Sequence, residues 1–145
     1  FVYIMSAIKK RPCPDSIPST VAKHMDRFGM DLLVSTFSDR IQVLISQKDG
    51  KVGTMMNASH EFSQIDNSHT YHIETLLGER SNDLYGVFAR QILERIVKLG
   101  DGMNCPPLLL GITLTSKCNP EDFKVIVDEV VAMYQQAIQK VAQRS

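Results

Sequence analysis

In two neighbouring stretches of the chain, mostly apolar residues recur at every second position: Leu33, Ser35 and Phe37, and then Ile41, Val43 and Ile45. A period of two places side chains of one kind on one face of a strand. The pattern therefore predicts two strands, joined by a hairpin turn at Ser38 and Asp39. After the Asp49–Gly50 pair, which favours a type I turn with a bulge, alternation returns at Val52, Thr54 and Met56. Three hairpin-linked strands in succession predict an antiparallel meander.

A polar stretch over residues 57–67 is expected to be a loop, and alternation over residues 70–77 predicts a fourth strand that ends at Gly78. A helix is predicted next, with Ser81 as its N-cap, because apolar residues follow at helical spacing as far as Leu99. Its expected end is the segment 100–102, which contains two glycines.

The apolar run 108–115 is short enough to be a buried central strand. Asn119 is then expected to cap a second helix that has Pro120 in its first turn. This helix carries the longest apolar stripe in the sequence, from Phe123 to Val141. The predicted fold class is α+β, a mostly antiparallel sheet with two helices packed on it in the order ββββαβα.

Turn-forming prolines and one short helix candidate, residues 20–28, characterise the first part of the chain. We therefore expect residues 1–29 to be an N-terminal arm and residues 30–145 to form a single α+β domain. The length of 145 residues suits one domain that needs neither a disulfide nor a metal to hold its core.

Charge and cysteine content narrow the range of functions. Lys and Arg number 16, and so do Asp and Glu, so nothing favours a protein that binds nucleic acid or an anionic membrane by net charge. Three cysteines, Cys13, Cys105 and Cys118, form no CxxC motif, which fits reduced thiols in the cytosol or nucleus. We expect them to be small packing or surface residues.

No residue set in the sequence predicts catalysis or metal binding. His69 and His72 are three positions apart on a predicted strand and so point to opposite faces, while His24 and His60 stand alone in the arm and the loop. The usual nucleophile, zinc and nucleotide motifs are missing from the sequence. The expectation is therefore no catalytic residue, no metal site and no cofactor.

Met55 and Met56 adjoin on a predicted strand and must face opposite ways. If one packs in the core, the other displays a soft apolar group on the outside of the sheet. An apolar group displayed on a sheet favours a binding role over catalysis.

Several short segments, in the same order, resemble the proteasome assembly chaperone 3 family. They are residues 36–47, residues 50–55, the Leu76-Leu77-Gly78 step and residues 87–90, followed by the apolar strand and the last helix. The Leu-Leu-Gly step is also similar to proteasome assembly chaperone 4, the sister family. The long arm and the insertion at 81–83 depart from the third chaperone and favour the fourth.

The resemblance implies a non-catalytic protein of the cytoplasm and nucleus that pairs with its sister chaperone. Such a heterodimer binds α subunits of the core proteasome and promotes assembly of the α ring, with no nucleic acid or membrane as partner. The resemblance concentrates near the Asp49–Gly50 hairpin and the loop after Leu77, so we expect the partner-binding residues to be Lys51, Gly53, Glu79 and Arg80. The alternative is a small-molecule-binding or enzymatic α+β domain with no recognisable motif.

Overall fold

Six strands and two helices make up the part of the chain that the computed structural model describes, residues 19–47, 51–78, 83–100, 105–115 and 119–144. In chain order they are β1 (Ser19–Met25), β2 (Met30–Thr36), β3 (Ile41–Ser46), β4 (Thr54–Ser63), β5 (Ser68–Leu77), α2 (Asp83–Leu99), β6 (Leu108–Thr113) and α3 (Pro120–Arg144).

The strands form one sheet in the order β1-β2-β3-β6-β4-β5. Among the described strands β3 and β6 make the one parallel pair, and the other neighbours are antiparallel. The predicted meander is therefore wrong at its third strand, because β6 lies between β3 and β4. The buried central strand predicted at 108–115 is confirmed as β6.

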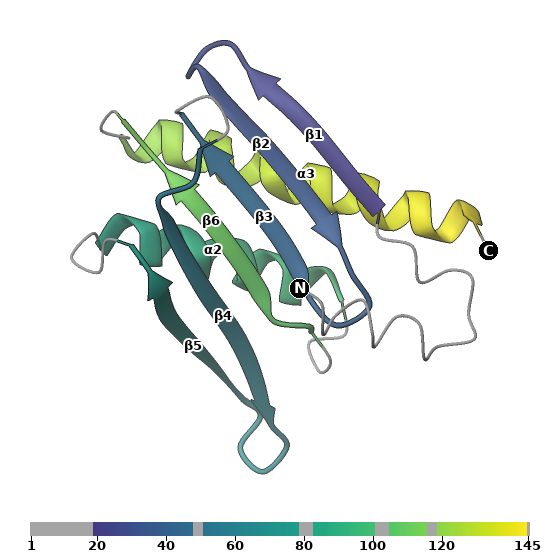
Figure 1. Ribbon diagram of the computed structural model, residues 1–145. Helices are drawn as coiled ribbons and strands as arrows, with labels where there is room; N and C mark the ends of the chain where they lie inside the picture. Colours follow the sequence, from purple (N-terminus) through teal and green to yellow (C-terminus); the bar gives the residue numbers. More distant parts are fainter. Residues whose placement is uncertain (1–18, 48–50, 79–82, 101–104, 116–118, 145) are drawn as a thin grey trace.

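Both helices cover the same face of this sheet, as Figure 1 shows. α3 packs on β1 and β2, and α2 packs on β4, β5 and β6. Every second residue of the central strands points into this layer and is 0–2% exposed: Leu32, Val34, Ile41, Val43, Ile45, Leu108, Leu110 and Ile112. The α+β class with two helices on a mostly antiparallel sheet is confirmed.

The helix predictions also hold where the structure describes them. The amide of Asp122 donates to Asn119 Oδ1 at 2.8 Å, so Asn119 is the N-cap of α3. The rings of Phe88 and Phe123 lie 4.4 Å apart and join α2 to α3. The N-cap predicted at Ser81 and the Asp49–Gly50 turn lie outside the described residues.

Residues 19–29 are part of the sheet and contain no helix. β1 pairs antiparallel with β2 from Ser19 to Met25, and a turn that ends at Gly29 (φ +58°) connects the two strands. The helix predicted over 20–28 is wrong because the spacing of Val21, Met25 and Phe28 fits a helical stripe while tertiary pairing makes the segment a strand. The rest of the predicted arm, residues 1–18, lies outside the described residues.

β4 and β5 form a long hairpin, and the loop predicted over 57–67 is wrong for most of its length. β4 continues to Ser63, and the connection is the short segment 64–67, with Asn67 at φ +54°. β6 pairs with β4 only between Thr54 and Ala58. Residues 59–72, here called the projecting hairpin, therefore extend beyond the other strands (Figure 1).

Candidate functional surface

One apolar row crosses the face of the sheet that the helices leave open. Its members are direct cross-strand partners, one from each strand of the sheet: Ala22, Leu33, Leu44, Gly111, Met55 and Leu77. Leu33 and Leu44 alternate with fully buried residues on their strands and so face away from the helices. No described element covers this row, which makes it the main candidate for a binding surface.

Polar residues border the apolar row on both sides. The neighbouring row on one side contains Thr20, Ser35, Gln42, Asn57 and Glu74, with Leu109 as its one apolar member. The row on the other side contains His24, Asp31, Ser46 and Thr113. Protein interfaces typically have an apolar centre and a polar rim, and this surface has the same arrangement.

Gly111 allows the apolar row to close in the middle of the sheet. A Cβ at this position would stand 2.7 Å from Leu44 Cδ2, 2.8 Å from Val52 Cγ1 and 3.0 Å from Met55 Sδ. Leu44 of β3, Met55 of β4 and Val52, which precedes β4, therefore pack over the glycine backbone. On this face, apolar side-chain atoms therefore cover the β6 backbone at the position where Gly111 has no side chain of its own.

A shallow groove of about 460 Å³ lies on the same face over β1, β2 and β3. Ala22, Leu33 and Leu44 line it, and they also belong to the apolar row. His24 and Asp31 stand at its polar end. The groove is therefore part of the apolar row, and it forms a depression that a partner side chain can fill.

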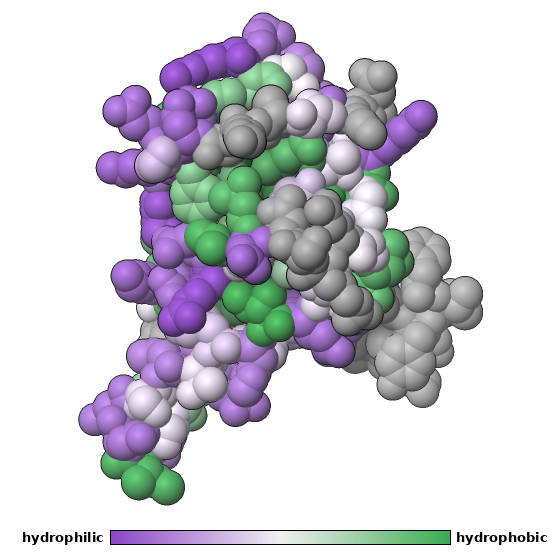
Figure 2. All heavy atoms as spheres, turned by 90° about the vertical axis from the view of Figure 1, so that its left-hand side faces the viewer, coloured by the Kyte–Doolittle hydropathy of each residue, from purple (hydrophilic) through white to green (hydrophobic). Residues whose placement is uncertain are grey.

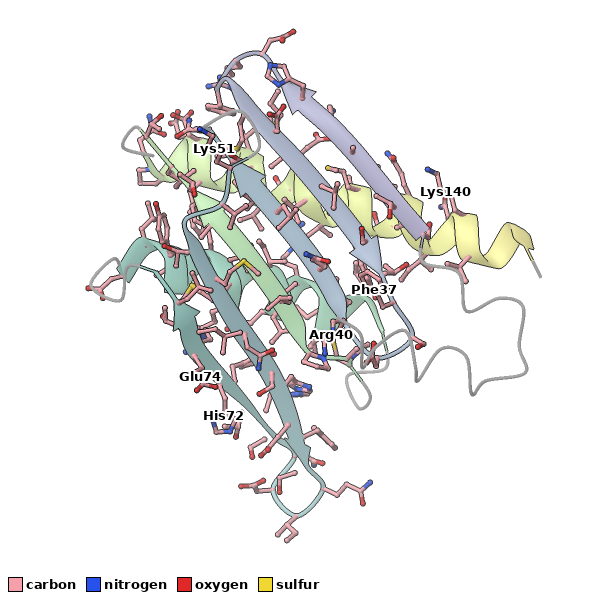
Figure 3. The ribbon with its side chains drawn as sticks, viewed as in Figure 1. Phe37, Arg40, Lys51, His72, Glu74 and Lys140 are labelled. Carbon is pink, nitrogen blue, oxygen red and sulfur yellow. The ribbon has the colours of Figure 1, made fainter. Side chains whose placement is uncertain are left out.

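Two of the four predicted partner-binding residues lie beside this row. The backbone carbonyl of Lys51 accepts a hydrogen bond from Ser46 Oγ at 2.7 Å, and the amide of Gly53 donates to Thr113 Oγ1 at 2.6 Å. These bonds fix the segment that carries Val52 onto Gly111, at the upper end of the sheet where Figure 3 labels Lys51. Glu79 and Arg80 lie outside the described residues, so the binding role of all four remains a prediction.

The sequence pattern missed the row itself. Met56 is 5% exposed and Met55 lies in the row, so the expectation that one methionine is displayed outside the core is confirmed. The other members come from strands whose order the sequence did not give. These residues are aligned in one row only by the pairing register of the strands, which depends on the position of β6 between β3 and β4.

His24, Asp31 and Ser46 lie in one polar row, but they do not form a hydrolytic triad. His24 Nδ1 lies 2.7 Å from Asp31 Oδ1, and His24 Nε2 lies 3.3 Å from Asp26 Oδ1, so carboxylates occupy both ring nitrogens. The Ser46 hydroxyl donates to the Lys51 carbonyl. The hydrogen bond to Asp31 raises the pKa of His24, which favours the imidazolium over a general base.

The projecting hairpin brings together two histidines that the sequence treated separately. His60 is in β4, not in a loop, and His60 Nε2 lies 2.8 Å from His69 Nδ1. Burial, and secondarily the charge of His69, lowers the pKa of His60. His72 points to the opposite face, 3.8 Å from Glu61, so the expected separation of His69 and His72 is confirmed. No group of three metal-ligating side chains occurs among the described residues.

Cys105 is half-buried, and burial raises the pKa of its thiol, as expected of a packing residue. The other two cysteines lie outside the described residues. None of the helices in the described part of the chain has the length and apolar content needed to cross a membrane.

Comparisons with known proteins bear on the family and the fold of this chain. Residues 43–133 match the profile of the family described as proteasome assembly chaperone 3. A solved structure, described as a novel chaperone complex for yeast 20S proteasome assembly, contains a chain that superposes with a TM-score of 0.57 at 19% identity, covering 81% of this chain and 98% of that one. No curated protein sequence matches significantly. The matched segment runs from β3 to α3 and includes Leu44, Met55, Leu77 and Gly111 of the apolar row, and by that match the chain belongs to the proteasome assembly chaperone 3 family.

Proposed function

We propose that this protein is a non-catalytic chaperone of proteasome assembly that acts as a heterodimer with a sister chaperone. The heterodimer binds α subunits of the core proteasome and promotes assembly of the α ring, in the cytoplasm and nucleus. The family match supports the process, and the single structural observation that carries the binding role is the apolar row on the open face of the sheet.

The row is suited to pairing with a second sheet. Sheets stack face to face at about 10 Å when apolar side chains of both inner faces interdigitate. Leu33, Leu44 and Met55 are half-buried and project from a rigid sheet, so little side-chain freedom is lost on binding. A stable heterodimer needs a larger apolar surface than a transient contact does. We therefore assign the apolar row to the sister chaperone.

The end of the sheet near Lys51 and Gly53 is assigned to α subunits. Proteins often carry their recognition residues on segments that a rigid sheet holds in place. Here the hydrogen bonds from Ser46 to Lys51 and from Gly53 to Thr113 hold the segment that leads into β4. Lys51 is exposed there. Lys51→Glu tests this assignment, with lower affinity for α subunits and unchanged affinity for the sister chaperone as the expected result.

The test of the row compares two substitutions on the same strand and face. Leu44→Lys places a charge in the apolar row, while Gln42→Lys places the same charge in the polar row beside it. Loss of a central apolar contact costs about 2 kcal/mol or more, so Leu44→Lys should weaken binding of the sister chaperone about thirtyfold. Gln42→Lys should change it less than threefold.

Affinity is measured by titration calorimetry with the purified sister chaperone, after thermal melts have shown that both variants fold. Equal affinities of the two variants would remove the row from the interface. The alternative function, binding or turnover of a small molecule in the groove, would gain support if a metabolite raised the melting temperature of the wild type and Leu44→Lys abolished that shift.

A further inference from the structure

β5 is an edge strand with a full length of unpaired backbone. It pairs with β4 on one side and with no described strand on the other, from Ser68 to Leu77. Natural edge strands are usually blocked by Lys, Pro or a covering element. β5 contains neither Lys nor Pro, so its outer backbone is open to a further strand.

The opposite edge of the same sheet is blocked in the expected way. Lys140 of α3 donates to the backbone carbonyl of Thr20 in β1 at 3.2 Å. Lys23, also in β1, pairs with Glu129 of α3 at 2.6 Å. Figure 3 shows Lys140 beside β1 and leaves the outer side of β5 without such a cover among the described residues. The β1 edge is therefore blocked against pairing with a further strand, whereas no described residue blocks the β5 edge in this way.

The side chains of β5 complement themselves. His72 and Glu74 flank Ile73 and point to the open face, and Figure 3 shows both beside the outer strand. In an antiparallel pair of two identical strands centred on Ile73, His72 of each copy lies directly opposite Glu74 of the other. The imidazole N–H of His72 can donate a hydrogen bond to the Glu74 carboxylate, and the pair becomes an ion pair when the imidazole is protonated. Polar cross-strand pairs of this kind stabilise a sheet, and a twofold axis produces the contact twice.

We propose that β5 pairs antiparallel with β5 of a second copy of this chain, about a twofold axis through Ile73. The regular ladder runs from Tyr71 to Thr75 of each copy and ends before the register shift in which Thr75 pairs with Met56 and Leu77 with Met55. Ile73 contacts its own counterpart at the centre on the helix-facing side. The two sheets become one continuous sheet with both His72–Glu74 pairs on its open face.

Exposed apolar side chains along this edge favour the same occupant. Leu76 near the end of β5 is 48% exposed, and Val87 of α2 is 47% exposed. Figure 2 looks onto this edge and shows hydrophobic groups in its middle, with the projecting hairpin extending away from the body. In the proposed register the projecting hairpin of each copy runs alongside the edge that carries these residues in the other.

The pairing leaves the apolar row free. A twofold axis perpendicular to the sheet keeps the helices of both copies on one side, so both open faces remain on the other side. Edge pairing and binding of the sister chaperone can thus occur together, and the two interactions can fail independently.

The test is sedimentation equilibrium of the purified chain over a range of concentrations. The wild type should show a reversible dimer. Glu74→Lys places Lys opposite His72 and should raise the dimer dissociation constant about tenfold or more, from two lost pairs of up to about 1 kcal/mol each. The double variant His72→Glu/Glu74→Lys places Glu of each copy opposite Lys of the other in this register and should restore the dimer.

Asp26→Lys is the matched control, because it makes the same charge change at a fully exposed carboxylate in the β1–β2 turn. It should leave the dimer unchanged. A monomer at all concentrations, a dimer that Glu74→Lys does not weaken, or a double variant without recovery would each overturn the proposal. A dimer that Leu44→Lys abolishes and Glu74→Lys leaves intact would place self-association on the open face and also overturn it. Leu44→Lys should leave the dimer intact while it weakens binding of the sister chaperone, which separates this test from the proposed function.

Discussion

Leu44 of β3 lies directly opposite Gly111 of β6, with Leu44 Cδ2 only 2.7 Å from the point where a Cβ of residue 111 would stand. The atoms that crowd this point are ends of side chains, from Leu44, Val52 and Met55. Gly78 is crowded differently. Its Cβ would lie 2.4 Å from the carbonyl oxygen of Gly53 and 2.6 Å from Thr54 Cα, and its φ is +99°.

Gly111→Ala should fold and bind less well. The surrounding side chains can shift by rotation, so the expected loss of unfolding free energy is about 1 kcal/mol, the lower end of the range for an added methyl group in a packed site. The shift separates the apolar groups in the middle of the row and should lower affinity for the sister chaperone several-fold. Urea denaturation and calorimetry measure the two effects, and a loss of stability without any loss of affinity would contradict this assignment of Gly111.

Gly78→Ala should destabilise the fold. The new methyl group meets backbone, which cannot rotate away, and an L-residue is strained at a positive φ. We expect a loss of about 1–3 kcal/mol in the free energy of unfolding, measured by urea denaturation. Gly29→Ala is the control, because Gly29 also has a positive φ of +58° but nothing lies within 4 Å of its Cβ position. Equal losses in the two variants would mean that the backbone contact at Gly78 contributes nothing.

Residues with strong periodicity were predictable from the sequence. β2, β3, β6 and both helices appear where alternation or helical spacing predicts them, because each presents one face to the core. The segment of β1 has a helical pattern in the sequence, because Val21, Met25 and Phe28 are spaced four and three apart. The distal half of β4 has the polar sequence of a loop, because the projecting hairpin has no layer behind it and so lacks a fully apolar face.

The candidate surface was predictable only in part. The display of Met55 follows from its neighbour Met56 and the period of a strand. The alignment of Met55 with Leu44 through Gly111 depends on β6 entering between β3 and β4, a pairing between segments more than fifty residues apart. Local patterns contain no information about such an insertion.

Val130→Asp should unfold the protein. Val130 is 0% exposed in the layer between α3 and the sheet, and an unpaired buried carboxylate costs several kcal/mol against a total stability of about 5–15 kcal/mol. Gln136→Asp places the same charge on the exposed side of α3 and should melt within a few degrees of the wild type. A cooperative melt of Val130→Asp near the wild-type temperature would show that α3 is not part of the core.

His60 and His24 should titrate on opposite sides of the ordinary histidine value of 6.5. Burial and the charge of His69 lower the pKa of His60, whereas the hydrogen bond to Asp31 raises that of His24. As pH falls below 6.5, the unfolded chain gains a proton at residue 60 before the folded chain does, so this group reduces stability at low pH. His24 stabilises the fold below 6.5, and that contribution is lost as pH rises through its raised pKa.

Because the two effects on stability oppose each other, the measurement must resolve single residues. Nuclear magnetic resonance titration of the imidazole Cε1 protons does so. His69→Ala removes the second cause of the shift and leaves burial, so the pKa of His60 should rise toward 6.5, while the curve of His24 stays where it was. A His60 curve centred at or above 6.5 in the wild type would contradict the lowered pKa of His60. A curve that His69→Ala does not move would show that the 2.8 Å contact between the two rings has no electrostatic consequence.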